Sequence, residues 1–285
     1  MPNGRDLAFA GFGNDTIYAD TNDTVFAGAG DDTVIGRTSI FGGAGADSLQ
    51  LLEAGVAGGG AGNDTITGSM GADTLFGGAD ADLIRDNNDD VGDLIFGGAG
   101  IDTIAISAGD TVFGGDSADS IRASPEGSTL VFGGGGGDYI RGSGNGFSDT
   151  LGGGEGSDTI LGRGGGDVLF GGSGSMDGAD SIVGDGGADT IFGGDADTVT
   201  GGQEADLGDD DTDRFDFTGS NLSNAAVGII TDFEVGLDKL VVLQGATITA
   251  SLSSIDVMVD LNGDGTGDVR IINGAVNGFS TDDFA

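Results

Sequence analysis

The apolar residues of this chain lie in very short clusters that are separated by runs of Gly, Asp and other small polar residues. A polar residue followed by one aliphatic residue recurs along the chain, as in Thr65-Ile66 and Thr74-Leu75. Because neighbouring side chains of a strand point to opposite faces, only the aliphatic residue of each pair can point inward. The pattern predicts many short strands, each of which buries a single aliphatic side chain.

These short strands alternate with a glycine-rich unit, GGxGxD, whose period is nine residues. Unbroken copies stand at residues 42–47, 59–64, 97–102, 133–138 and 153–158. A second period is carried by Phe, which closes many strands at spacings close to one or two times eighteen residues, as at Phe96 and Phe113. Two units therefore make one coil. We expect the Phe ladder to be packing, facing inward or along one edge, with an aromatic ligand stack as the alternative.

A chain that alternates tight turns with short strands in this way winds into a flattened helix with two parallel sheets. We therefore predict an all-β fold in which residues 1–207 form a right-handed parallel β-roll. The repeat stops at about residue 208, where strands become longer and more ordinary. Residues 208–285 are predicted to form a small β-rich domain that caps the roll.

Composition excludes most familiar catalytic and metal chemistry. The chain has no His and no Cys, which excludes Ser-His-Asp and Cys-His nucleophiles, zinc on His or Cys ligands, iron–sulfur clusters and disulfides. Its 48 acidic and 9 basic residues give a net charge of −39, and such a surface repels nucleic acid and anionic lipid. No apolar stretch approaches the roughly 20 residues of a membrane span. Hard cations are the natural partners.

The acidic residues are almost all Asp, since only five of the 48 are Glu and 48 − 5 leaves 43 Asp. The short Asp carboxylate bends back onto a turn and reaches a hard cation that lies there. One carboxylate per turn, repeated along a stack, would bring like charges to about 5 Å from one another. Metal ions between the turns would relieve this repulsion. The alternative is that the Asp side chains cap their turns without metal.

The nonapeptide GGxGxDxUx resembles the signature of the RTX (repeats-in-toxin, hemolysin-type) calcium-binding β-roll over roughly residues 10–207. In that family, Asp carboxylates and turn carbonyls of two successive loops on one edge enclose each Ca²⁺, so the resemblance implies several calcium ions. Departures such as Asp80 and Ser117 in place of a Gly affect single ions rather than the architecture. The carboxylates that match the motif are Asp15, Asp32, Asp47, Asp64, Asp73, Asp82, Asp93, Asp102, Asp119, Asp138, Asp149, Asp158, Asp167, Asp180 and Asp189.

The C-terminal region carries a second resemblance. The segments TDFEVGLDKL at 231–240, DLNGDGTGDVRI at 260–271 and the final STDDFA are similar to the C-terminal domain of serralysin-type RTX proteins. That resemblance implies an uncleaved signal for type I secretion. Within it, Asp260, Asn262, Asp264 and Asp268 form a loop that looks like a further calcium site, with a metal-free turn as the alternative.

The function expected from these features is that of a secreted, extracellular or cell-surface structural protein that folds when it binds calcium. The N-terminus lacks the basic and apolar regions of a cleaved secretory signal, and repeats begin by residue 10, which leaves no room for a preceding catalytic domain. Roles in a surface layer, a filament or adhesion, through self-assembly or a cell-surface polysaccharide, are favoured. An RTX accessory module and a carboxylate-dependent polysaccharide-active enzyme remain alternatives, and ice binding is disfavoured. No enzymatic activity is expected.

Overall fold

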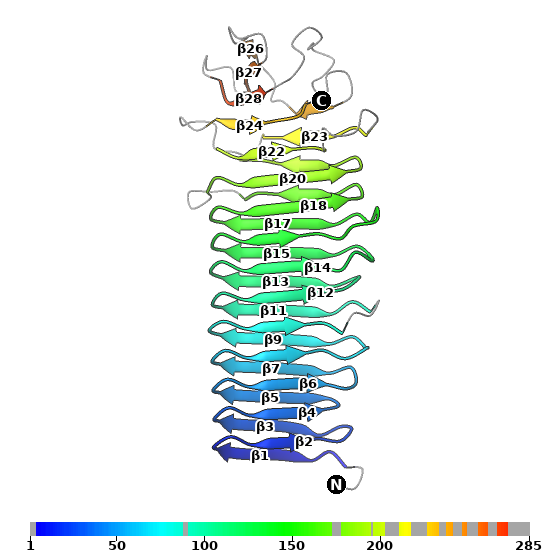
Figure 1. The fold of residues 1–285 in the computed structure, drawn as a ribbon, viewed down its shortest axis with the longest axis vertical. Coiled ribbons are helices and arrows are strands. Elements are labelled where there is room, and N and C mark those ends of the chain that lie inside the picture. The colour runs from blue at the N-terminus through cyan, green and yellow to red at the C-terminus, as the bar shows by residue number, and fades with distance from the viewer. Residues whose placement is uncertain are drawn as a thin grey trace. The chain divides into compact units, whose positions relative to one another are not determined.

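The structure, a computed structural model, forms two compact units, Met1–Gly135 and Gly136–Ala285. Both units consist of strands joined by turns, and no helix occurs in the described residues (Figure 1). The predicted all-β fold is therefore confirmed. The described residues are 4–87, 91–172, 178–194, 196–202, 211–217, 227–233, 238–241, 247–249, 256–261 and 267–272.

The first unit contains two parallel sheets whose strands alternate along the chain, so that each coil contributes one strand to either sheet. One sheet is formed by β1 (Leu7–Phe12), β3 (Thr24–Ala29), β5 (Ser39–Ala44), β7 (Val56–Ala61), β9 (Thr74–Ala79), β11 (Leu94–Ala99), β13 (Thr111–Asp116) and β15 (Leu130–Gly135). The other is formed by β2 (Thr16–Tyr18), β4 (Thr33–Gly36), β6 (Ser48–Leu51), β8 (Thr65–Thr67), β10 (Leu83–Arg85), β12 (Thr103–Ile106) and β14 (Ser120–Ala123).

The second unit repeats this arrangement. Its first sheet comprises β17 (Thr150–Glu155), β19 (Val168–Phe170), β21 (Thr190–Phe192), β23 (Arg214–Asp216) and β25 (Lys239–Val241). Its second sheet comprises, in spatial order, β16 (Tyr139–Arg141), β18 (Thr159–Gly164), β20 (Ser181–Gly186), β22 (Thr198–Thr200), β24 (Gly228–Ile230), β28 (Val269–Ile272), β27 (Asp256–Asp260) and β26 (Thr247–Thr249).

Parallel pairing continues beyond the last nonapeptide unit. Strand β23 pairs with both β21 and β25, and β24 pairs with β22 and β28. Among the described strands, only the pairs β26–β27 and β27–β28 are antiparallel, and they form a meander that ends the second sheet. The predicted domain boundary at 207/208 stays a prediction.

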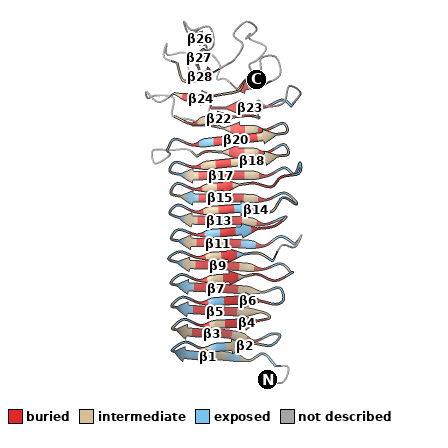
Figure 2. Cartoon of the chain, in the orientation of Figure 1, coloured by how far each residue is buried: buried red, intermediate tan, exposed pale blue. Residues whose placement is uncertain are grey.

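The interior of each unit consists mainly of one row of aliphatic side chains on either sheet, and some strands bury a second one, as with Leu51 in β6 and Ile106 in β12. In β9, for example, Leu75 is fully buried, Thr74 is half-buried and Phe76 is 41% exposed. Figure 2 shows such buried positions recurring from strand to strand. The expectation that only the aliphatic residue of each pair points inward is confirmed, because strand alternation sends its two neighbours outward.

The Phe ladder lies on the outer face of the first unit's odd-numbered strands, not in the interior. Phe76 and Phe96 stack with ring centroids 5.1 Å apart and an angle of 4° between their planes. Phe96 stacks in turn on Phe113, at 5.3 Å and 10°. The prediction of packing is confirmed by the stacked rings; of the two directions it allowed, inward or along one edge, the inward one is wrong, because Phe directly follows an inward-facing residue of the strand. Stacking between coils buries the ring faces and leaves ring edges exposed.

The glycines of the motif allow the chain to turn at the end of each longer strand. Gly43 has φ +119° and Gly45 has φ +127°, a backbone conformation that side chains with a Cβ rarely adopt. Asp80 and Ser117, which replace a motif glycine, keep positive φ values of 75° and 81°. The turn is therefore preserved at both departures from the motif, although its backbone is strained there.

Candidate metal centre

The motif Asp is the last residue of each turn and lies directly before a strand. Asp64 precedes β8 and Asp82 precedes β10, and both are buried. The backbone amide of Asp64 donates to Oδ1 of Asp82, one coil further along the chain, at 2.8 Å. The carbonyl of Asp64 accepts from the amide of Leu83 at 2.8 Å. Each such Asp therefore links two coils through its backbone and its side chain.

These links form a continuous row along one edge of the first unit, which we call the first ladder. Each amide in it donates to the carboxylate of the next Asp at 2.8 Å. Its members are Asp15, Asp32, Asp47, Asp64, Asp82, Asp102 and Asp119.

The other edge of the first unit carries a second ladder, which is interrupted. Asp6 is linked to Asp23, and further along Asp73 is linked to Asp93 and Asp93 to Asp110. Between them the coils place Thr38 and Gly55 at the equivalent positions, where Gly55 only donates its amide to Asp73. This edge therefore presents two shorter groups of carboxylates.

The second unit has a ladder on each edge, built by the same bonds at 2.7–3.0 Å. One ladder comprises Asp138, Asp158, Asp180 and Asp197. The other comprises Asp149, Asp167, Asp189, Asp213 and Asp238.

All fifteen Asp residues that the motif singles out in the roll thus lie in one of the four ladders, while their role as calcium ligands stays a prediction. The sequence reasoning missed six further members, which do not end a complete GGxGxD unit but stand directly before a strand. A search for Asp followed by a polar-aliphatic pair, as in Asp110-Thr111-Val112, would have found several of them. The six are Asp6, Asp23, Asp110, Asp197, Asp213 and Asp238.

The second oxygen of these carboxylates provides the test of whether a cation fits. In the ladders, Oδ1 accepts the amide of the neighbouring coil, but Oδ2 of many members is buried without a hydrogen-bond partner. A buried oxygen without a partner costs about 1–3 kcal/mol, and more when it is charged. A bound cation would satisfy it, so the residues fit a metal ion. Such oxygens belong to Asp15, Asp32, Asp47, Asp64, Asp82, Asp93, Asp102, Asp167 and Asp189.

Backbone carbonyls converge on the same points. A Cβ added to Gly97 would meet both Oδ2 of Asp102, from its own turn, and the carbonyl oxygen of Gly114, from the next coil. Gly77 faces Asp82 and the carbonyl of Gly97 in the same way. The absence of a side chain thus brings a carboxylate oxygen of one coil close to a carbonyl oxygen of the next. Carboxylate and carbonyl oxygens are the ligands that Ca²⁺ prefers.

The electrostatics of the ladders are those of crowded carboxylates that are buried from solvent. Burial raises the pKa of Asp64 to about 6 and that of Asp82 to about 7, and neighbouring Asp charges add to both shifts. Burial likewise raises the pKa of Asp167 to about 7 and of Asp189 to about 8. The charged form of each group is therefore disfavoured in the absence of a compensating cation.

The predicted C-terminal loop is described only in part. Asp260 ends β27 and is buried, and the amide of Leu261 donates to Oδ2 of Asp268 at 2.7 Å. This bond closes the connection between the antiparallel strands β27 and β28. Asn262 and Asp264 lie outside the described residues, so the complete ligand set stays a prediction.

Residues 3–34, 20–38, 59–84, 143–175 and 176–207 match the RTX calcium-binding nonapeptide repeat. The repeat region is an RTX β-roll. Among curated proteins, no sequence matches this chain. The matched RTX segments include strands and ladder positions of both compact units, so the same calcium-binding repeat builds the two.

The RTX repeat binds calcium, and the four ladders present carboxylate oxygens, which are the kind of ligand that this ion prefers. Bound Ca²⁺ would supply positive charge between the turns. The residues of the roll position the oxygen atoms: the Asp amides fix each neighbouring carboxylate, and the glycines leave room for carbonyl oxygens beside it. A row of such sites would tie each coil to the next.

Proposed function

We propose that this chain is a secreted structural protein that folds when its ladders bind calcium and then assembles at the cell surface or in the extracellular matrix. The observation that best supports calcium-dependent folding is the row of buried Oδ2 atoms that lack hydrogen-bond partners. Without cations, the carboxylates repel one another along each edge. With little more than one row of aliphatic side chains on each sheet, the interior offers little apolar burial to offset this repulsion and the chain entropy.

The calcium step is tested by circular dichroism in a chelator and during titration with Ca²⁺ or Mg²⁺. We expect a disordered chain in chelator, β structure in millimolar Ca²⁺, and a much weaker response to Mg²⁺, which demands rigid octahedral sites. A chelated protein with full β structure would contradict the proposal. A variant of the first ladder, with Asp64, Asp82 and Asp102 all changed to Asn, should require more calcium. The matched control removes three exposed charges through Asp80→Asn, Asp116→Asn and Glu126→Gln.

Export before folding is the second part of the proposal. Free calcium is low inside cells, so the chain would stay extended there and fold outside, where binding to the folded form alone stabilises it. Nowhere in the described part of the chain is there a helix long and apolar enough to cross a membrane. We assign the export signal to residues 208–285 because of their serralysin-like segments.

Export is tested in cells that carry a type I exporter. Deletion of residues 208–285 should retain the chain inside, and fusion of these residues to an unrelated passenger should lead to its secretion. The fusion tests the export signal more directly than the deletion does, because the deletion also removes β23, which pairs with β21 of the roll. Secretion of the truncated chain, together with retention of the fusion, would refute this assignment.

Assembly would proceed through the N-terminal coil, where β1 pairs with β3 and leaves its other edge open in the described residues. Leu7 is 59% exposed and Phe9 is 70% exposed, whereas Phe26, which pairs with Phe9, is 38% exposed. An open strand edge with uncovered apolar side chains can dock a second copy, and a head-to-tail contact that does not close propagates as a chain or lattice. The competing possibility is that the N-terminal residues cover this edge.

The assembly step is tested by light scattering in millimolar calcium over a range of protein concentrations. The intact protein should form larger species, and the double variant Leu7→Asp, Phe9→Asp should remain monomeric while it still folds with calcium. An intact protein that is monomeric at high concentration would disprove assembly but leave calcium-coupled folding untouched.

A structural role is favoured over an enzymatic one, because the buried carboxylates already hold neighbouring coils together. A polysaccharide partner is less well supported by the Phe ladder, because its rings stack on one another and present edges rather than faces to a sugar. A glycan-binding assay on the calcium-loaded protein distinguishes the two partners: retention by polysaccharide would favour adhesion over self-assembly.

A further inference from the structure

One turn of the first unit departs from the motif in a way that adds a carboxylate. In the regular turn, Gly68 stands five residues before Asp73 and directly after β8. In the next coil the equivalent position is Asp86, directly after β10, and it stands seven residues before Asp93. The register establishes this equivalence, because Arg85 pairs with Thr67 and the amide of Gly68 donates to the carbonyl of Arg85 at 2.9 Å. A longer turn thus places Asp where the motif has Gly.

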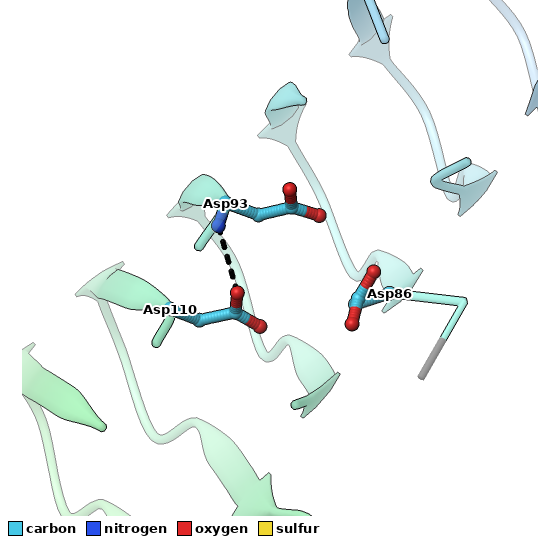
Figure 3. A group of neighbouring side chains, drawn as sticks. All are labelled: Asp86, Asp93 and Asp110. Atoms are coloured by element: carbon cyan, nitrogen blue, oxygen red, sulfur yellow. Dashed lines mark hydrogen bonds between the residues drawn. The ribbon is translucent and has the colours of Figure 1, made fainter. Parts of the chain in front are cut away.

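The added carboxylate lies against two members of the second ladder. One oxygen each from Asp86, Asp93 and Asp110 lie within 4.8 Å of one another. Figure 3 shows the carboxylates of Asp93 and Asp110 pointing toward that of Asp86. Asp93 is only 3% exposed, and its Oδ2 has no hydrogen-bond partner. The cluster therefore contains a buried, unsatisfied oxygen that faces the two other carboxylates.

Protein donors position this cluster without satisfying that oxygen. The hydroxyl of Ser107 donates to Oδ2 of Asp86, and its amide donates to Oδ2 of Asp110 at 2.9 Å. The amide of Asp93 donates to Oδ1 of Asp110 at 2.8 Å. Three donor groups, two of them from Ser107 and one from Asp93, thus hold Asp86 and Asp110 in place, and what the site lacks is positive charge.

A fourth carboxylate lies nearby on the preceding coil. A Cβ added to Gly68 would lie 3.1 Å from Oδ2 of Asp73 and 3.6 Å from both Oδ1 of Asp86 and Oδ2 of Asp93. Oxygens of three Asp residues therefore converge on one side of a glycine. Cation affinity in oxygen sites rises with the number of charged ligands and with their rigidity.

We propose that Asp86, Asp93 and Asp110 form a three-carboxylate cation site, which binds Ca²⁺ more tightly than the regular turns of the roll and fills first. The inference deepens the proposed calcium binding and rests on it. The added carboxylate of Asp86 distinguishes this site from a turn that supplies only its ladder Asp and glycine carbonyls. A trivalent lanthanide, which prefers hard anionic ligands, should favour this site still more.

The test is a Ca²⁺ competition titration of the full-length protein against a fluorescent chelator, repeated with Tb³⁺. The variant Asp86→Gly restores the motif residue and is therefore compatible with the turn. We expect it to weaken the tightest binding constant at least tenfold, for both ions, and to leave the weaker sites unchanged. Asp86→Asn, which keeps the size of the side chain, should show the same loss. Circular dichroism in excess calcium verifies that both variants fold.

The matched control is Asp80→Gly. Asp80 is exposed, has a φ of 75° and also replaces a motif glycine, so this variant removes one charge from the opposite edge of the same coil. Its tightest binding constant should equal that of the unaltered chain. Equal tightest constants for Asp86→Gly and the unaltered protein would overturn the site while leaving calcium-coupled folding intact. An unaltered protein that binds no calcium would overturn both.

Discussion

The backbone amide of Asp82 donates to Oδ1 of Asp102 at 2.8 Å, across a full coil of the roll. Asp102 in turn donates its amide to Oδ1 of Asp119, also at 2.8 Å. Asp102 therefore accepts a hydrogen bond from the coil before it through its carboxylate and donates one to the coil after it through its amide. Loss of one member should disturb both neighbours, so calcium binding and folding along an edge should be cooperative.

Removal of one ladder charge should show this cooperativity. Asp102→Asn keeps an oxygen for the amide of Asp82 but removes the charge that would face a cation. We expect the calcium concentration at half-folding to rise about tenfold, equivalent to ~1.4 kcal/mol, with a shallower transition. Circular dichroism during calcium titration measures both quantities. Asp116→Asn, an exposed change on the following strand, should leave the curve unchanged, and equal shifts in the two variants would argue against the ladder.

Acid should partly replace calcium. Burial raises the pKa of Asp82 to about 7 and of Asp189 to about 8, from an ordinary value of 3.8. The folded state therefore binds protons at these groups more tightly than the unfolded chain. The stability that their protonation contributes is fully present below about pH 4 and is lost as pH rises through about 6–8. In chelator, β structure should increase as pH falls from 8 to 5. A calcium-free chain that loses β structure as pH falls from 8 to 5 would contradict the raised pKa values of the buried Asp residues.

Calcium-loaded protein should show the opposite dependence on pH. Calcium binds the charged carboxylates, and protons compete for them. The calcium concentration needed for half-folding should rise as pH falls from 8 to 6. Calcium titrations at several pH values, compared with the chelated protein at the same pH values, therefore distinguish the effect of protons on calcium binding from their effect on the calcium-free chain.

Gly97→Ala tests the convergence of oxygens at a turn. The new Cβ would meet the carbonyl of Gly114 and Oδ2 of Asp102, and such overpacking costs about 1–3 kcal/mol. Gly135 provides the control, because an added Cβ there meets nothing within 4 Å and its φ is not positive. Thermal unfolding in saturating calcium should show a lower midpoint for Gly97→Ala alone. Equal midpoints would mean that the turn tolerates a side chain.

Phe96→Ala tests the outer aromatic stack. Phe96 lies between Phe76 and Phe113, with centroid distances of 5.1 and 5.3 Å. Loss of two stacked pairs should lower the free energy of unfolding by about 1–3 kcal/mol. Phe147 is 41% exposed in a turn of the second unit, so Phe147→Ala should change stability by less than ~0.5 kcal/mol. Denaturant unfolding in calcium compares the two variants, and equal effects would exclude a special role for the stack.

Much of the fold follows from the position of Asp in the repeat. The nine-residue spacing of Asp64, Asp73 and Asp82 alternates between the two edges, and this alternation predicts two strands in each coil. The spacing could not reveal Asp110, which no glycine pair precedes although its carboxylate occupies the same ladder. Its place is determined by pairing between β11 and β13, and pairing between coils is not visible in a local motif.

The direction of the Phe side chains was harder to predict, because both neighbours of an inward-facing residue in a strand must point outward. Size and hydrophobicity favour a buried Phe, whereas strand alternation places Phe96 outside once Ile95 is inside. The three-carboxylate cluster was likewise hidden, because only Asp93 matches the motif, whereas Asp86 stands at a glycine position and Asp110 follows no glycine pair. The register of β10 with β8 and β12 positions Asp86, and the pairing of β11 with β13 aligns Asp93 with Asp110.

Every coil is joined to its neighbours by bonds that span little chain: the link from Asp64 to Asp82 covers 18 residues. A pulling force applied to the ends of such a unit would release it one coil at a time. Each release would extend the chain by about 60 Å, given an extended length of 3.3–3.6 Å per residue. Calcium would raise the force needed for each step, because it adds a bond at the point where two coils separate. The concentration of an ion would then control the extensibility of the protein under load.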